Sequence, residues 1–101
     1  MQGLALRGLK EESISKVKIV QDDGTEWLLE YFLQTCKRPG EDVFYGLKVE
    51  KSTTDGVLVE REETFVTESY DEAVAMVTAF AKGTVPPRVL FEMVDEWEWK
   101  R

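Results

Sequence analysis

The sequence predicts an α+β fold in which a four-stranded antiparallel meander sheet is followed by two C-terminal helices packed on one face, in the order ββββαα. Three observations predict it. Four stretches with strand-like alternation are separated by short turn signals rich in Gly, Asp and Pro. A helix-start signal and two apolar stripes of helical period follow them. Because the connections are short, sequential strands are expected to pair with one another.

The first two expected strands form a hairpin. Residues 16–21 alternate between apolar and polar, and Asp22-Asp23-Gly24 then supplies residues that tolerate the positive φ of a tight turn. The next strand, 25–36, is expected to be central because both of its faces are largely apolar. One face carries Trp27, Leu29, Tyr31 and Leu33, and the other carries Leu28, Glu30, Phe32 and Gln34.

The second expected hairpin joins strands 43–50 and 57–66 through the turn residues Thr53-Thr54-Asp55-Gly56. The fourth strand has a polar middle, residues 60–63, which is typical of the edge of a sheet. Gly46 lies within the third strand and indicates a bulge or the close approach of an aromatic ring.

The remaining residues predict two helices. Ser69 and Glu72 have the spacing of a capping box, and Gly83 is the expected C-terminal stop. Pro86-Pro87 then favours the start of a second helix. The expected inner faces are Ala73, Met76, Val77, Phe80 and Ala81 on the first helix, and Leu90, Met93, Val94 and Trp97 on the second.

The 101 residues are enough for one domain and too few for two. Residues 1–13 are interpreted as a flexible or lead-in arm because they show no sustained period, and residues 14–101 as a single α+β domain. The alternative that residues 1–13 add a further edge strand to the sheet is left undecided by the sequence.

Composition excludes several classes of function. The formal net charge is −7, which disfavours direct binding to nucleic acid or to an anionic membrane surface. Cys36 is the only cysteine, so no intramolecular disulfide can form, and no apolar run is long enough to span a membrane. We therefore expect a cytoplasmic protein.

The segment from Phe44 to Trp97 resembles a family of small uncharacterised bacterial proteins, a domain of unknown function found mostly in spore-forming Gram-positive species. The resemblance rests on Tyr45-Gly46-Leu47-Lys48-Val49-Glu50, on Asp55-Gly56-Val57-Leu58-Val59-Glu60 and on Lys82-Gly83-Thr84-Val85-Pro86-Pro87. These motifs are structural rather than catalytic. The resemblance implies a bacterial origin and a cytoplasmic setting, and it brings no active site with it.

No catalytic, cofactor-binding or metal-binding residue is assigned from the sequence. The absence of His excludes a Ser-His triad and every His-ligated metal site. Cys36 is interpreted as an ordinary half-buried cysteine. Glu60 and Glu62 share one face of a strand and could form a catalytic carboxylate pair, but a solvated edge with Lys or Arg opposite is favoured.

The sharpest functional indication is surplus apolar surface. Leu28, Phe32 and Phe44 are expected on the sheet face that the helices leave uncovered, where they would form a self-association or partner surface. Trp99 lies two positions beyond the inner face of the last helix, and either packs back onto the sheet or anchors a partner.

The sequence favours a small non-enzymatic protein-interaction or regulatory module without a cofactor, which binds a protein partner or itself as a homodimer. An acidic decoy that binds a basic nucleic-acid-binding protein is the alternative, motivated by the acids at 60–72 and 92–98. A carboxylate- or metal-dependent enzyme is the third hypothesis, and it requires at least three acids that converge in a concave site.

Overall fold

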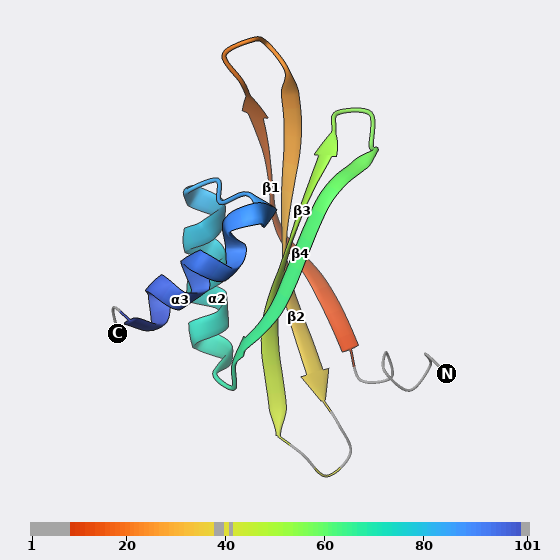
Figure 1. The fold of residues 1–101 in the computed structure, drawn as a ribbon. Helices are drawn as coiled ribbons and strands as arrows, with labels where there is room; N and C mark the ends of the chain where they lie inside the picture. The colour runs from red at the N-terminus through yellow and green to blue at the C-terminus, as the bar shows by residue number, and fades with distance from the viewer. Residues whose placement is uncertain (1–8, 38–39, 41, 100–101) are drawn as a thin grey trace.

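The computed structural model describes residues 9–37, 40 and 42–99. Its single four-stranded sheet has the order β1-β2-β3-β4, and each neighbouring pair is antiparallel. The elements are β1 (Leu9–Val20), β2 (Glu26–Lys37), β3 (Val43–Thr53), β4 (Leu58–Thr67), α2 (Tyr70–Lys82), the 3₁₀ turn η1 (Pro87–Val89) and α3 (Leu90–Trp99). Both helices lie on the same side of the sheet (Figure 1), so the predicted ββββαα meander is confirmed.

Two glycine turns close the hairpins as the sequence predicts. Gly24 and Gly56 have φ values of +88° and +98°, a region that glycine enters without steric cost. In each turn the glycine N–H donates to the carbonyl three residues earlier, that of Gln21 or of Thr53. Both turns therefore lie at the same end of the sheet (Figure 1).

The first strand begins earlier than residue 16. Leu9 pairs with Cys36, and β1 then follows β2 over its whole length, with one irregularity between Ser13 and Ser15. The structure thus divides the segment 1–13, because residues 9–13 belong to β1 whereas residues 1–8 lie outside the described residues. Periodicity could not place residues 9–13 in a strand, since their pairing with β2 is a tertiary contact.

The core lies between the sheet and the two helices. Its buried apolar side chains are Leu29, Tyr31, Leu33, Leu47, Val49, Ala73, Met76, Val77, Phe80, Ala81, Val85, Leu90 and Val94. Tyr31 is fully buried, and its hydroxyl donates to the Val85 carbonyl at 2.9 Å. This bond joins the central strand to the chain that connects α2 with η1, and burial raises the pKa of Tyr31.

The inner faces of both helices match those expected. Trp97 of α3 meets Phe80 of α2 edge to face, with 6.0 Å between the ring centroids. The capping interaction is also present, because the Glu72 N–H donates to Ser69 Oγ. The Ser69 N–H donates to Thr67 Oγ1, which in turn donates to Glu72 Oε1, so Thr67 takes part in the cap.

Gly46 combines the two features predicted for it. The pairing of β3 with β4 shifts between Tyr45 and Gly46, and the Phe65 ring lies directly over Gly46. A Cβ atom at this position would lie 2.7 Å from the Thr64 carbonyl oxygen and 2.8 Å from Phe65 Cδ1. The missing side chain is therefore what lets β4 and its aromatic ring approach β3.

Tyr31→Phe is expected to lower the free energy of unfolding by about 1–3 kcal/mol, because it leaves the buried Val85 carbonyl without its donor. Urea denaturation measures the change. Tyr70→Phe is the matched control, since Tyr70 is 51% exposed. Equal stability of the two variants would contradict the role given to this bond.

Gly46→Ala is expected to lower the free energy of unfolding by roughly 1–3 kcal/mol, because the backbone of β4 must move away from the new methyl group. Gly83→Ala is the control, since its nearest neighbour to an added Cβ is 3.6 Å away and its φ is −85°. Thermal unfolding measures the stability of both variants and of wild type. A Gly46→Ala protein as stable as wild type would show that the fold does not need the close approach of β4 to Gly46.

Candidate interaction surface

One face of the sheet is turned away from α2 and α3 and is here called the open face (Figure 1). A belt of hydrogen-bonded polar side chains crosses it. Each strand contributes to this polar belt, which consists of Glu11, Gln34, Lys48, Glu50 and Glu63. Gln34 Nε2 donates to Glu11 Oε2 at 2.8 Å and to Glu63 Oε1 at 2.7 Å. The belt thus joins β1, β2 and β4 through one buried amide.

Lys48 is the cationic centre of the belt. Its Nζ lies 2.9 Å from Glu11 and 3.4 Å from Glu50, and it sits 4.4 Å from the centroid of the Phe32 ring. Burial lowers the pKa of Lys48, but the two carboxylates raise it more, so the net shift is upward. The ammonium group and its aliphatic stem cover Phe32, which is half-buried as a result.

The belt divides the apolar surface that the sequence predicts. Leu28 lies at the end of the sheet that carries the two hairpin turns, whereas Phe44 lies at the opposite end, opposite Cys36. Leu28 and Phe32 are half-buried, and Phe44 is 41% exposed. The three predicted residues therefore share the open face, but the structure does not bring them together into one continuous patch.

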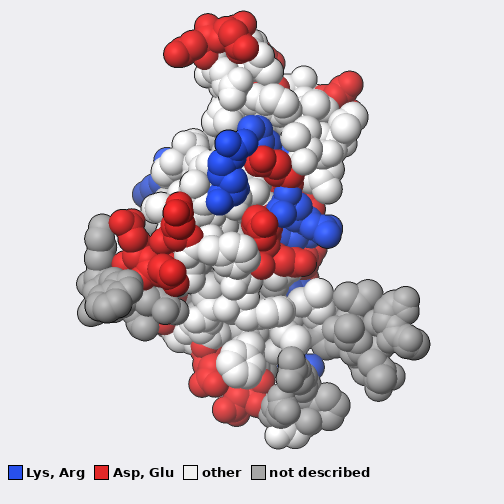
Figure 2. All heavy atoms as spheres, in the orientation of Figure 1, with Lys and Arg blue, Asp and Glu red and all other residues white. Residues whose placement is uncertain are grey.

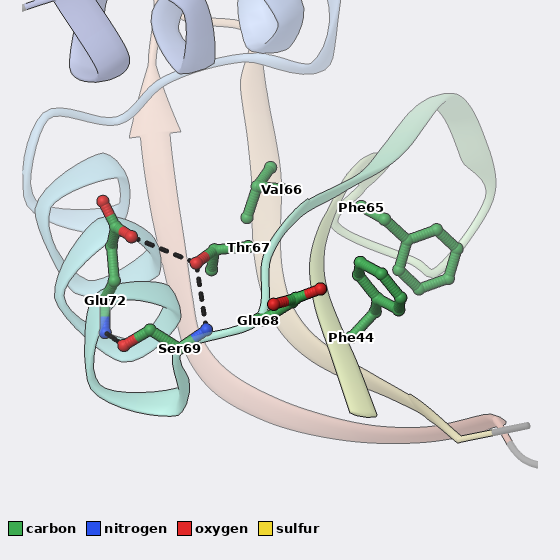
Figure 3. Close-up of a pocket in the computed structure, with 7 residues that line it drawn as sticks. All are labelled: Phe44, Phe65, Val66, Thr67, Glu68, Ser69 and Glu72. Carbon is green, nitrogen blue, oxygen red and sulfur yellow. Dashed lines mark hydrogen bonds between the residues drawn. The ribbon is translucent and has the colours of Figure 1, made fainter. Parts of the chain in front are cut away.

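A shallow hollow of about 660 Å³ lies at the Phe44 end. The aromatic hollow, as we call it, is lined by Phe44, Phe65, Val66, Thr67, Glu68, Ser69 and Glu72 (Figure 3). The Phe44 and Phe65 rings lie side by side, and the Glu68 carboxylate is drawn between Thr67 and Phe44 (Figure 3). Phe65 is 51% exposed, so two large rings face solvent here.

Sequence reasoning missed Phe65. It lies in the strand with the polar middle, and its importance comes from pairing opposite Gly46, which frees the space that its ring occupies. The signal available in the sequence was a glycine in β3 and an aromatic residue in β4. Only the register, with its shift beside Gly46, brings these two positions together.

The other residues singled out in the sequence do not line the hollow, or their side chains are not among those that the structure describes. Trp99 ends α3, but its side chain is outside the described residues. Cys36 is half-buried at the end of β2. Glu60 and Glu62 point to the helix-covered face, where Glu60 lies opposite Lys51 and accepts a hydrogen bond from Arg88 at 3.1 Å. This is the paired edge that the sequence favours.

Acidic side chains are distributed over several parts of the surface. In the view of Figure 2 they fall into separate groups, with a group of Lys and Arg side chains between them. Among residues 9–37, 40 and 42–99, no three Cys, Asp or Glu side chains are arranged to hold a metal ion. Within the same residues, neither helix has the length and apolar character that crossing a membrane requires.

Glu11→Gln is expected to make the protein less stable at neutral pH and less sensitive to acid. Partial burial raises the pKa of Glu11, but hydrogen bonds from Lys48 and Gln34 outweigh it, so the pKa lies below the ordinary 4.5. The stabilisation is complete above that ordinary value and is lost as the pH falls through the lower folded pKa. Urea midpoints measured from about pH 7 to pH 2 should therefore converge for the two proteins.

Glu12→Gln is the control for this comparison, since Glu12 is the next residue of β1 and is exposed. If the difference in urea midpoint between wild type and Glu11→Gln stays constant across the pH range, the stabilising role given to the Glu11 carboxylate is wrong.

The comparisons with known proteins identify one family. No curated protein and no solved structure matches the chain. The model of a family of unknown function, DUF6514, matches residues 10–99, which include both helices and, apart from Leu9 of β1, all four strands. The chain therefore belongs to the DUF6514 family.

Proposed function

We propose that this protein is a small non-enzymatic protein-interaction module, and that the aromatic hollow is its docking surface. The observation that carries the proposal is the pair of exposed rings, Phe44 and Phe65, at the end of the open face. Aromatic side chains contribute much of the binding energy at protein interfaces, because they bury large areas at a low cost in conformational entropy. The helices cover the other face and leave this one accessible.

The backbone that carries both rings belongs to paired strands of the sheet. Phe65 rests on Gly46, in a strand paired with the buried β3, and Phe44 belongs to β3 itself. A preformed surface loses little conformational entropy when a partner binds. Internal charge pairs occupy the middle of the open face, and its exposed aromatic rings lie at the Phe44 end.

The proposal also includes the role of the protein in the cell. The resemblance to small proteins of spore-forming Gram-positive bacteria supports a bacterial and cytoplasmic role. A regulatory task fits a chain of 101 residues that presents one small docking surface. The partner is either another protein or a second copy of this chain.

Phe65→Gln is expected to weaken partner binding at least about tenfold, because it removes one ring of the docking surface. Phe91→Gln is the matched control, since Phe91 is 50% exposed and lies on α3. The measurement is affinity capture of the tagged proteins from the native lysate, with partners quantified by mass spectrometry, beside light scattering of each purified protein.

Two results would count against this function. Capture of the same partner, in the same amount, by wild type and Phe65→Gln would remove the hollow as the docking surface. If the amount of captured partner falls at high salt but is the same for wild type, Phe65→Gln and Phe91→Gln, the acidic decoy would be favoured instead.

A further inference from the structure

The chain twice places a lysine ammonium over an aromatic ring, and at one of these places carboxylates pair with the lysine. Lys48 lies 4.4 Å from the Phe32 centroid and forms ion pairs with Glu11 and Glu50. Lys51 lies 4.6 Å from the Trp27 centroid, and β4 places Glu60 opposite Lys51. In each case the ring face attracts the cation through its quadrupole, and at Lys48 two carboxylates also supply the opposite charge.

The aromatic hollow has two of these three components. Phe44 and Phe65 supply ring surface, and Glu68 lines the same hollow with its carboxylate (Figure 3). Glu68 is exposed at the rim, and no Lys or Arg is among the seven residues that line the hollow in the described part of the chain. Among these described lining residues, the component that is not represented is a cationic side chain.

We propose that the hollow binds a Lys or Arg side chain from an extended segment of a partner protein. The inference rests on the proposed function and names the chemistry of the partner. Arg is the better fit, because its planar guanidinium stacks on aromatic faces and still donates to a carboxylate. The shallow shape suits a side chain presented by another protein surface.

The positive end of the α2 dipole works against a cation at this place, but its effect is offset. Asp71 and Glu72 both lie in the first turn of α2, where their charges oppose the dipole. The Ser69 side chain also accepts from the Glu72 N–H, which satisfies one of the free amides there. Glu68 and Asp71 add acidic side chains at this end of α2, which complement a cationic segment.

The test begins with a selection of random peptides displayed on phage against the whole protein. Selected peptides are synthesised in two forms, one natural and one with citrulline in place of Arg and Nε-acetyl-lysine in place of Lys. Fluorescence anisotropy measures their affinities, and amide chemical shifts locate the binding site. Neutralising the cation is expected to weaken binding roughly three- to thirtyfold at the hollow.

Two variants and two matched controls separate the ring and charge contributions. Glu68→Gln and Phe65→Leu should each weaken the natural peptide, and Glu68→Gln should affect the neutral peptide much less. Glu92→Gln and Phe91→Leu alter exposed residues of the same types on α3 and should leave affinity unchanged. Thermal unfolding of each variant establishes that the fold is retained.

The outcomes distinguish this inference from the proposed function. Peptides that bind at the hollow equally well with and without the cation would retain the interaction function and overturn the cationic partner. Peptides that shift amides elsewhere, or a selection that yields none, would overturn both. Self-association that Phe65→Leu abolishes would identify a second copy as the occupant and overturn the cationic partner segment.

Discussion

The governing constraint on this structure is that a four-stranded sheet has two faces, and the two short helices cover only one. On the covered face, apolar side chains are buried under the helices, and the Tyr31 hydroxyl donates a hydrogen bond to the Val85 carbonyl. On the open face, side chains of the sheet itself must shield the central strands from water. Its central strands carry Gln34 and Lys48, whose buried polar groups would be costly without partners.

The polar belt is the solution on the open face. Lys48 covers the Phe32 ring and is itself paired with Glu11, while Gln34 donates to carboxylates from both edge strands. Charges partly removed from water in this way are tolerated because each has a partner of opposite charge or a hydrogen bond. The belt also binds β1 and β4 to the centre of the sheet, and it confines the exposed aromatic surface to one end.

The interaction proposal depends on this division of the open face. A continuous apolar face would predict broad sheet-on-sheet association, which buries a large area with little chemical selectivity. A small aromatic hollow beside Glu68 predicts recognition of particular side chains instead. Lys48, which lies over the Phe32 ring and pairs with Glu11, shows that this sheet already stabilises a cation between a ring and a carboxylate.

The sequence by itself determined the element order, the glycine turns, the helix cap and the buried helix faces, because each depends on neighbours within a few positions along the chain. The tertiary structure decided the rest. Residues 9–13 became strand only by pairing with β2, and Lys48 covered the ring predicted to be exposed. The register shift beside Gly46 placed Phe65 next to Phe44. These contacts join residues distant in sequence, and local periodicity carries no information about cross-strand register.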